Sequence, residues 1–371
     1  MKILYAIQGT GNGHLARAME IIPVLKQMGD TDILISGIQG DLQLPFDIKY
    51  RLYGMSFIFG TKGGVNMLKT ILKMKLIRLF RDILKLPVND YDVVLCDFEP
   101  VTAWACKLKG KRCIGISHQN AVLHPNAPKP KNADWMGKWI LRNYAPSDIR
   151  YGFHFKQLDE SNYTPVIRPA IQHAHPENHG HYTVYLPSFS NKEIENVLLS
   201  FPDVQWEVFS KHSKQTYQMG NIRFQPVSLE GFNKSFISCE GILCNAGFET
   251  PSEALYMGKK LCVIPMKGQH EQQCNAAFLD QMGVMVLSRL DKMNLVKLNY
   301  WLESNNKLQI KYPNLIKEII GMIILKELSL DSEKTKPRKR KINASLPINK
   351  IGLKNAKEVV NVEPGLNEIR L

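Results

Sequence analysis

The first residues that could do chemistry form a glycine-rich loop after an apolar segment. Lys2–Ile7 predicts a buried strand, Gln8 to His14 contains three glycines, and a helix is predicted over Leu15–Met28. Such glycines let the chain turn tightly and expose backbone N–H groups at a helix N-terminus, where an anion or polar ligand is stabilised. The third glycine comes one residue too early for the dinucleotide pattern G-x-G-x-x-G. The loop therefore disfavours a nicotinamide enzyme.

His14 follows the first predicted strand at its carboxyl end, the edge at which open α/β sheets bind ligands. Histidine titrates near neutral pH without help, so His14 is a candidate general base. The alternative is a histidine that only caps the helix or lines the loop. Asp97 and Glu99 follow the predicted strand Val93–Cys96, so either carboxylate could be the base instead or could orient His14.

A second loop of this kind follows the predicted strand Gly241–Cys244. Thr250 is predicted to be the N-cap of the next helix, with Pro251 at its first position and Glu253 completing a capping box. The same geometry would make a cradle for a diphosphate, with outward-facing N–H groups after Gly247. Both interpretations can hold together.

One predicted strand later, at Lys260–Ile264, another polar cluster leads into a helix. Glu271 and Gln272 place a carboxylate beside an amide, which suits the adjacent hydroxyls of a sugar. The alternative is an ordinary polar first turn. Three such clusters at the ends of strands indicate one shared site.

The elements that must position these loops alternate between strand and helix, which predicts an α/β fold with parallel sheets covered on both faces. A second series of strands begins at His181. Between the two series, residues 156–180 are rich in Pro, His and Asn, as an interdomain linker is. We predict two Rossmann-like domains, 1–165 and 166–328, facing each other across a cleft, and a tail, 329–371.

Composition supports a folded protein with an unusual end. Hydrophobic residues make up 44% of the 371 residues and charged residues 22%, which is typical of globular proteins. Apolar periodicity disappears in the tail, and residues 334–341 are mostly basic, so we expect the tail to be disordered. The cysteines show no zinc spacing and no C-x-x-C pair, which indicates reduced thiols.

The start of the chain, its apolar stretches and its net charge indicate where the protein is found and which partners it could bind. The chain starts without the regions of a secretory signal, and its longest apolar stretches, such as 319–325, are too short to cross a bilayer, so we expect a cytoplasmic protein. A formal net charge of +14 would attract anionic lipids, nucleotide phosphates or nucleic acid. Because no nucleic-acid motif is recognised and the tail lacks aromatic residues, we expect no nucleic-acid partner.

Four motifs, in the order in which they occur along the chain, resemble those of GT-B fold glycosyltransferases. The resemblance is to the branch that contains the lipid-linked N-acetylglucosaminyltransferase of peptidoglycan synthesis and the UDP-glycosyltransferases. Gly9–His14 resembles the G-T-G-G-H loop of that branch, and Ser117–Asn120 resembles its H-E-Q-N segment without the glutamate. Ala246–Glu253 resembles the donor-site helix, and Gly268–Ala276 resembles the [D/E]-Q-x-x-N-A stretch. The resemblance covers residues 1–325, approximately.

The resemblance implies an inverting hexosyltransferase, which moves a hexose or N-acetylhexosamine from a nucleotide sugar, commonly UDP-linked, to an acceptor hydroxyl. It implies that His14 is the base, that Glu253 grips the ribose, and that the amides of 248–250 face the phosphates. With the residues above, the candidate site residues are catalytic His14, Asp97 and Glu99, donor-binding Gly11, Gly13, Gly247, Phe248, Glu249, Thr250, Glu253, Glu271 and Gln272, and acceptor-side His118 and Asn120. The arginine expected by analogy near the donor pyrophosphate is not obvious.

We expect no cofactor and no essential metal. Attack by the acceptor oxygen needs a base for its proton and positive dipoles for the leaving diphosphate, and the predicted loops supply both. Two D-x-D strings, Asp30–Asp32 and Asp90–Asp92, precede their strands and therefore lie at the wrong edge of the sheet.

The segment 68–85 has six basic residues and one acidic residue on a strongly apolar background. Such a helix can lie on an anionic membrane surface, although a core-packed helix with a solvated basic face has the same pattern. With the family resemblance, this favours a lipid-linked or cell-envelope acceptor and a peripheral position on the inner face of the membrane.

Two alternative functions remain open at this point. A nucleotide-sugar epimerase of the same two-half architecture would need only the donor. A non-catalytic protein that binds nucleotides or nucleic acid would keep the fold without the reaction.

Overall fold

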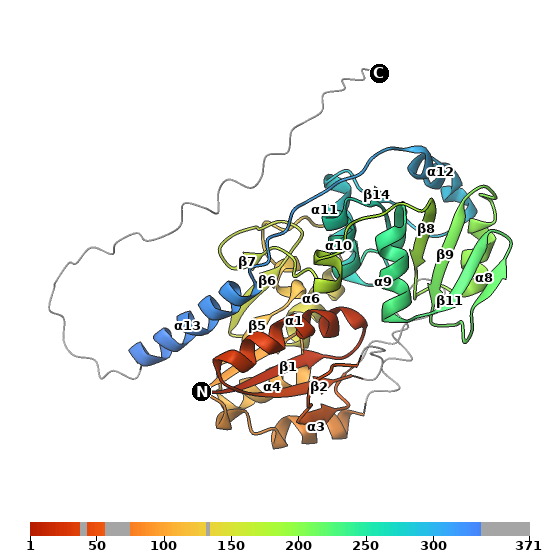
Figure 1. Cartoon of the computed structure of the whole chain (residues 1–371). Helices are drawn as coiled ribbons and strands as arrows, with labels where there is room; N and C mark the ends of the chain where they lie inside the picture. Colours follow the sequence, from red (N-terminus) through yellow and green to blue (C-terminus); the bar gives the residue numbers. More distant parts are fainter. Residues whose placement is uncertain (38–42, 56–74, 131–133, 335–371) are drawn as a thin grey trace, which may run out of the picture. The chain divides into compact units, whose positions relative to one another are not determined.

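The computed structural model describes residues 1–37, 43–55, 75–130 and 134–334. Met1–Leu325 forms one compact unit that contains two parallel-stranded sheets, each with helices packed against it (Figure 1). The predicted α/β class with two Rossmann-like halves is confirmed.

The first sheet has the strand order β3-β2-β1-β4-β5-β6-β7, and all its neighbouring strands are parallel. The order changes direction between β1 and β4, so the carboxyl ends of these two strands form a topological switch point, where α/β sheets bind ligands. The strands are β1 Lys2–Gln8, β2 Asp30–Ser36, β3 Tyr50–Leu52, β4 Val93–Asp97, β5 Ile114–Ile116, β6 Ile149–Phe153 and β7 Asn162–Tyr163.

The helices of the first half are α1 Asn12–Met28, α3 Leu76–Lys85, η1 Val88–Asp90, α4 Pro100–Lys109, α5 His118–Val122 and α6 Trp135–Tyr144. One side of the sheet packs Leu4, Leu34 and Val94 against apolar side chains of α3 and α4. The central strands are buried on both faces, as expected of a doubly covered parallel sheet.

The second sheet has the strand order β10-β11-β9-β8-β12-β13-β14, and only its β10–β11 pair is antiparallel. Its switch point lies between β8 and β12. The strands are β8 His181–Tyr185, β9 Gln205–Ser210, β10 Tyr217–Met219, β11 Ile222–Pro226, β12 Gly241–Asn245, β13 Lys260–Ile264 and β14 Met285–Val286.

The helices of the second half and of the end of the described chain are α7 Pro169–Gln172, α8 Asn191–Leu198, α9 Leu229–Ser238, α10 Glu249–Met257, α11 His270–Gln281, η2 Lys292–Asn294, α12 Leu295–Glu303 and α13 Ile316–Lys334. The core of this half packs Trp206 and Val184 of the sheet against Trp301 of α12. Most predicted elements are present within one or two residues of their expected ends.

Two local predictions differ from the structure. Thr250 is not an N-cap, because α10 already begins at Glu249 and Phe248 precedes it without a side-chain cap. The tail predicted from residue 329 begins inside α13, because this helix extends to Lys334. The rest of the predicted tail, 335–371, lies outside the described residues, as does 68–74 of the predicted basic helix.

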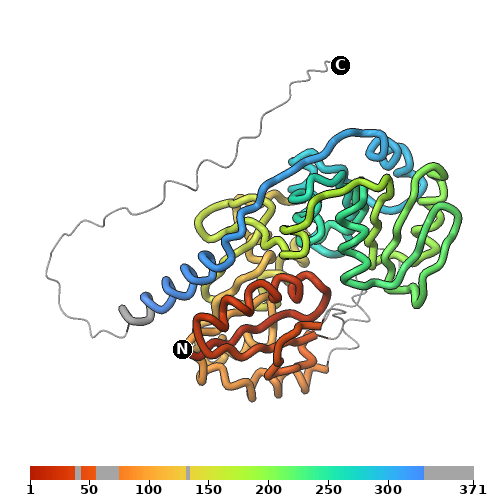
Figure 2. The backbone as a smooth tube through the Cα atoms, in the orientation of Figure 1, coloured from red at the N-terminus to blue at the C-terminus, as the bar shows by residue number. Residues whose placement is uncertain are grey.

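After α12 the chain returns to the first half, as the blue end of the tube in Figure 2 shows. The Tyr312 hydroxyl donates to the carbonyl oxygen of Phe155 at 3.1 Å, and Gly321 in α13 lies against Met28 at the end of α1. The predicted domain 166–328 therefore includes a segment that contacts the first half. The chain passes between the halves twice, once before β8 and once after α12.

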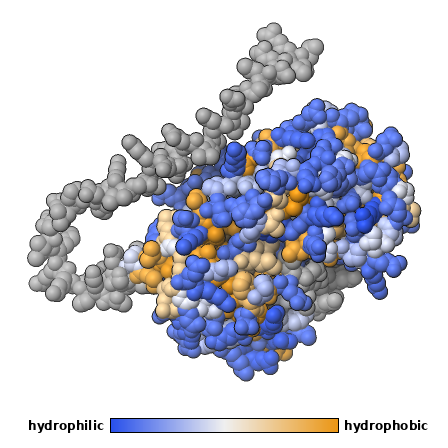
Figure 3. All heavy atoms as spheres, viewed as in Figure 1, coloured by the Kyte–Doolittle hydropathy of each residue, from blue (hydrophilic) through white to orange (hydrophobic). Residues whose placement is uncertain are grey.

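The face of the molecule in Figure 3 is mostly hydrophilic, with apolar side chains in separate groups. Within the described residues, no helix combines the length and the apolar character needed to cross a bilayer.

Candidate active site

The loop between β1 and α1 builds the first edge of the site. Gly11 has a φ of 89°, a conformation that favours glycine, and it turns the chain from strand into helix. A Cβ built on Gly13 would meet the carboxylate of Glu249 from the second half, so this part of the loop lies directly against that side chain. The loop thus brings the N-terminal end of α1 against helix α10.

His14 and Arg17 lie one turn apart on α1, and both contact Asp97 at the end of β4. His14 Nδ1 lies 2.8 Å from Asp97 Oδ1, and Arg17 Nη2 donates to the same oxygen at 2.8 Å. Because an ionised carboxylate only accepts hydrogen bonds, we assign the proton to Nδ1, which leaves Nε2 of the neutral ring unprotonated. That Nε2 lies 3.4 Å from Gln119 Nε2. His14 and Asp97 therefore have the geometry that a histidine base and its orienting carboxylate require.

Asp97 is fully buried, yet its surroundings favour the ionised form. Burial would raise the pKa of Asp97, but the charge of Arg17 and the hydrogen bonds from His14 and Arg17 outweigh it and hold the pKa of this carboxyl below its usual value. Burial would lower the pKa of Arg17, and Asp97 and Glu249 reverse that effect and raise it. A fixed carboxylate of this kind can stabilise the imidazole when it takes up a proton.

Phe98 forms one wall beside the base. Its φ is 54°, in the left-handed region that bulky residues rarely adopt. Its ring lies nearly parallel to the His14 ring, with 6.3 Å between the ring centroids, and stacks on Tyr144 with 4.8 Å between centroids. The backbone conformation directly after Asp97 thus places an aromatic ring next to His14.

Glu99 has a different position from Asp97, although both follow β4. It is fully buried and caps α4, accepting hydrogen bonds from the backbone N–H groups of Val101 and Thr102 at 2.8 and 2.7 Å. The Ser36 hydroxyl donates to the same carboxylate at 2.5 Å. Burial raises the pKa of Glu99 in spite of these hydrogen bonds. Its position suits a helix cap and does not suit the predicted role of a base.

Helix α10 forms the second edge of the site, after β12. A Cβ built on Gly247 would meet nothing within 4 Å, so open space lies beside the start of this helix. The N-terminal end of a helix favours an anion in such a space. Thr250 is half-buried in the first turn of α10. Phe248 points elsewhere, because its ring stacks on His118 of the first half with 3.9 Å between centroids.

Two carboxylates of α10 are held by arginines from outside the second sheet. Glu249 Oε1 accepts from Arg17 Nη1 at 2.6 Å. Both oxygens of Glu253 accept from Arg168, from Nε and Nη2 at 2.6 Å each. This bidentate pair is mostly buried, with 14% of the Arg168 side chain and 3% of the Glu253 side chain exposed.

The two predicted sugar-binding residues at the start of α11 differ in their contacts. Glu271 Oε2 accepts from Gln119 Nε2 at 2.9 Å, which joins it to the surroundings of His14. Gln272 is buried, and its Oε1 accepts from the backbone N–H of Met266 at 3.0 Å. Glu271 therefore lies nearer to the candidate base, whereas Gln272 stabilises the loop before α11.

The two predicted acceptor-side residues make internal contacts. His118 is buried, with Nδ1 2.8 Å from the carbonyl oxygen of Phe153 and Nε2 2.7 Å from Asn275 Oδ1. Burial lowers the pKa of His118. Asn120 Nδ2 donates to the carbonyl oxygen of Tyr151 at 3.1 Å. These side chains join the halves and fix α5 against the sheet.

Three further residues of the site were not identified from the sequence. Arg17 could have been found from its spacing, because a residue three positions after His14 lies on the same helix face. Gln119 lies inside a motif that was recognised. Arg168 had no sequence signal, since only the fold brings the linker before α7 against α10.

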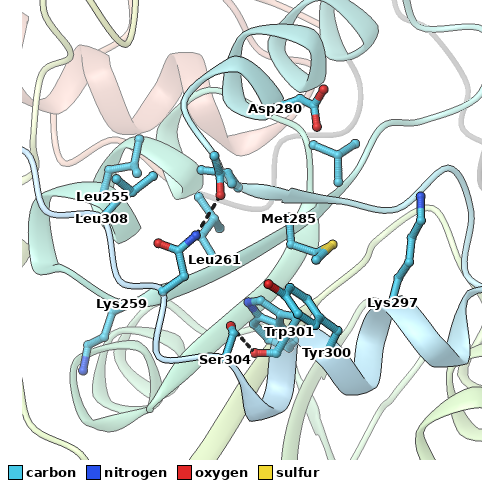
Figure 4. A pocket seen from close by; sticks show the side chains of 14 residues that line it. Leu255, Lys259, Leu261, Asp280, Met285, Lys297, Tyr300, Trp301, Ser304 and Leu308 are labelled. Carbon is cyan, nitrogen blue, oxygen red and sulfur yellow. Dashed lines mark hydrogen bonds between the residues drawn. The ribbon is translucent and has the colours of Figure 1, made fainter. Parts of the chain in front are cut away.

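A cavity of about 320 Å³ lies away from these residues, around the start of β13 and α12 (Figure 4). Its walls include Lys259, Met285 and Trp301. The candidate site lies instead at the carboxyl ends of the strands, so this cavity is separate from it. Within the described residues, no group of three or more His, Cys, Asp or Glu side chains is arranged to hold a metal ion.

Comparisons with known proteins agree with this architecture. The model of the family described as Glycosyl transferase family 1 matches residues 1–304. No curated protein matches the chain by sequence. Among solved structures, MurG of Acinetobacter baumannii is 15% identical with a TM-score of 0.50, and the match covers 87% of this chain and 99% of that one.

Two plant proteins show the same likeness of fold. UGT2 of Phytolacca americana, complexed with UDP-2fluoro-glucose and pterostilbene, is 13% identical with a TM-score of 0.52, covering 88% of this chain and 98% of that one. UGT89C1 of Arabidopsis thaliana, complexed with quercetin, is 11% identical with a TM-score of 0.52. This match covers 90% of this chain and 95% of that one.

Proposed function

This chain belongs to glycosyl transferase family 1, and from that premise we propose that it moves a hexose or N-acetylhexosamine from a UDP-linked donor to an acceptor hydroxyl with inversion. The observation that carries the proposal is the 2.8 Å contact between His14 Nδ1 and Asp97 Oδ1 at the switch point of the first sheet. No cofactor and no metal take part in the proposed reaction.

In the proposed reaction, His14 Nε2 takes the proton of the acceptor hydroxyl while the oxygen attacks the anomeric carbon. The new glycosidic C–O bond forms as the bond between the anomeric carbon and the diphosphate oxygen breaks, and UDP leaves. Asp97 stabilises the protonated imidazole, as in other carboxylate-oriented histidine bases. Backbone N–H groups at the start of α10 stabilise the negative charge on the leaving diphosphate.

The donor is proposed to lie along the second edge. Its diphosphate would occupy the open space beside Gly247, close to the loop with Gly11 and Gly13, and Glu271 would hold sugar hydroxyls with Gln272. Glu253 would accept hydrogen bonds from the ribose hydroxyls, because a carboxylate has more acceptor sites than the two used by Arg168.

The base is tested by His14→Ala. We expect kcat for sugar transfer to fall by about 10²–10⁴-fold, the usual contribution of a general base, while UDP still binds. UDP release in the presence of acceptor and calorimetric UDP binding measure the two effects. His124→Ala is the matched control, because His124 Nε2 also pairs with a carboxylate, Asp159 Oδ2, at 2.8 Å but outside the site. Wild-type kcat in His14→Ala would contradict the proposal.

The donor is tested by thermal stabilisation with UDP and UDP-sugars, because a ligand of the native state raises Tm by mass action. We expect a rise in Tm that Glu253→Gln reduces. Product analysis separates the alternatives: conversion of the UDP-sugar to its epimer without any acceptor indicates an epimerase, and no stabilisation by any nucleotide contradicts the donor assignment.

We also propose that helix α3 contacts an anionic membrane surface on the cytoplasmic side, where a lipid-linked or cell-envelope acceptor would be found. Ile77, Phe80 and Leu84 are 90%, 60% and 63% exposed and follow one another at helical spacing. Arg81 and Lys85 are exposed on the adjoining face. An exposed apolar face beside a basic face supports binding at a lipid interface.

Sedimentation with phosphatidylglycerol vesicles tests this contact. We expect the protein to sediment at low salt, and the double variant Ile77→Ser, Phe80→Ser to stay in the supernatant. The matched control replaces Met293 and Val296 by Ser, since these side chains are 87% and 81% exposed in the second half. Equal sedimentation of the two double variants, or none by the wild type, would contradict the proposal.

A further inference from the structure

We propose that Arg17 is a positioning residue shared by the two edges of the site. It holds Asp97 against His14, and it also holds Glu249 on α10 as long as no donor is bound. The inference rests on the proposed function, because it takes His14 as the base and α10 as the donor side.

The first support is the geometry of the guanidinium. Arg17 is 3% exposed. Its Nε and Nη2 donate to Asp97 at 2.8–3.1 Å, and its Nη1 donates to Glu249 Oε1 at 2.6 Å. A planar guanidinium presents its donors in fixed directions, so a single side chain sets the positions of both carboxylates.

The second support is the place that Glu249 occupies. Its carboxylate lies against Gly13, the second residue of α1, and Glu249 itself is the first residue of α10. The N-terminal ends of two helices therefore favour an anion there. The diphosphate of the donor is proposed to bind at the same helix ends. Because Glu249 is 25% exposed, its side chain can leave this place when the donor arrives.

Release of Glu249 would leave the contacts of the base intact. Only Arg17 Nη1 donates to Glu249, whereas Nε and Nη2 donate to Asp97. The arriving diphosphate would bring negative charge to the place that Glu249 leaves, so Arg17 keeps an anionic partner on each side.

The NMR signal of the hydrogen-bonded His14 Nδ1–H proton, assigned with His14→Gln, tests the first contact without requiring activity. We expect a downfield signal in the wild type that is lost in Arg17→Gln, because Asp97 is then no longer held against His14. An unchanged signal in folded Arg17→Gln would overturn the proposal. A wild type that transfers no sugar would overturn the proposed function instead, and the Nδ1–H signal would still report on Arg17.

Arg17→Lys supplies a second test if Arg17→Gln does not fold. Lysine keeps the charge but not the fork of donors, so Asp97 and His14 lose their fixed orientation. We expect kcat to fall by about 10–100-fold, as for a small misplacement of a catalytic group, with a much smaller change in the KM for the donor. Wild-type kcat in this variant would overturn the positioning role.

Glu249→Gln tests whether the Glu249 side chain leaves Arg17 when the donor binds. Since the ion pair is lost only from the donor-free protein, we expect UDP to raise the Tm of this variant more than that of the wild type. A smaller rise would mean that Glu249 holds the donor, and would overturn its release. Glu230→Gln is the matched control, because Glu230 also lies in the first turn of a helix of the second half; it should leave the rise in Tm unchanged.

Discussion

The two edges of the site compensate their charges in different ways. At the first edge, Asp97 is neutralised by Arg17 and contacted by His14, all from elements of the first half. At the second edge, Glu249 pairs with Arg17 and Glu271 with Gln119, both from the first half. Helices α10 and α11 supply these two carboxylates, and the first half supplies the partner of each.

This difference separates the base from the donor side. The first edge keeps its geometry through contacts within one half, so the base is oriented before any substrate binds. At the second edge, Glu249 and Glu271 have their observed partners only while the two halves touch, so these two side chains can exchange protein partners for a ligand. Four predictions test the difference, in order of decreasing effect.

The largest effect is expected from Asp97→Ala. This change leaves Arg17 buried with an uncompensated charge, so we expect the free energy of unfolding to fall by about 3–5 kcal/mol in urea denaturation. Glu271→Ala is the control at the second edge, where the partner left behind is the uncharged amide of Gln119, and should cost about 1 kcal/mol. Equal losses would show that the two edges are not different.

Glu253→Ala should have the next largest effect. It removes both acceptors of Arg168, a mostly buried guanidinium, so we expect a loss of about 2–3 kcal/mol in the same assay. Arg168→Ala should cost a similar amount, and the double variant should cost less than the sum of the two single changes. Additive losses would mean that the pair contributes nothing to the second edge.

Replacing one glycine of each edge by alanine should cost less stability, and the loss should differ between the two edges. Gly11→Ala places a Cβ at a φ of 89°, so we expect a loss of about 1–2 kcal/mol. Gly247→Ala meets no neighbouring atom and should stay within about 0.5 kcal/mol, while its methyl group weakens UDP binding. A loss of stability without weaker UDP binding in Gly247→Ala would argue against a donor at this place.

The smallest effect on the free energy of unfolding is expected from a change in pH, because two buried carboxyls change this free energy in opposite directions. The folded pKa of Asp97 is lowered, so its contribution exists above the unfolded pKa and is lost as pH falls through the folded value. The folded pKa of Glu99 is raised, so its contribution is lost as pH rises. On acidification, Asp97→Asn should therefore lose stability less steeply than the wild type, and Glu99→Gln more steeply. Urea midpoints between about pH 3 and 6 measure both slopes.

The sequence predicted the fold better than the site. Period and composition located the central strands of both sheets, because buried parallel strands are continuous apolar runs bounded by turns. The strands nearer the sheet edges, β3, β6, β7, β10 and β14, were not predicted. Asp97 and Glu99 looked alike in sequence, although Pro100 after Glu99 was a signal for a helix cap. The partner of Glu253 could not be predicted, because Arg168 reaches it only through the packing of the linker.

The backbone of Phe98 has a consequence for how this protein can change over time. An aromatic residue in the left-handed region costs about 1–2 kcal/mol of backbone strain, which a glycine at the same position would recover. Glycine would also remove the ring that stacks on Tyr144 and lies along His14, and losing a packed phenylalanine ring costs up to about 3–5 kcal/mol. Packing and the place beside the base therefore both favour the aromatic residue, so mutation to glycine at position 98 is selected against although it would relax the backbone.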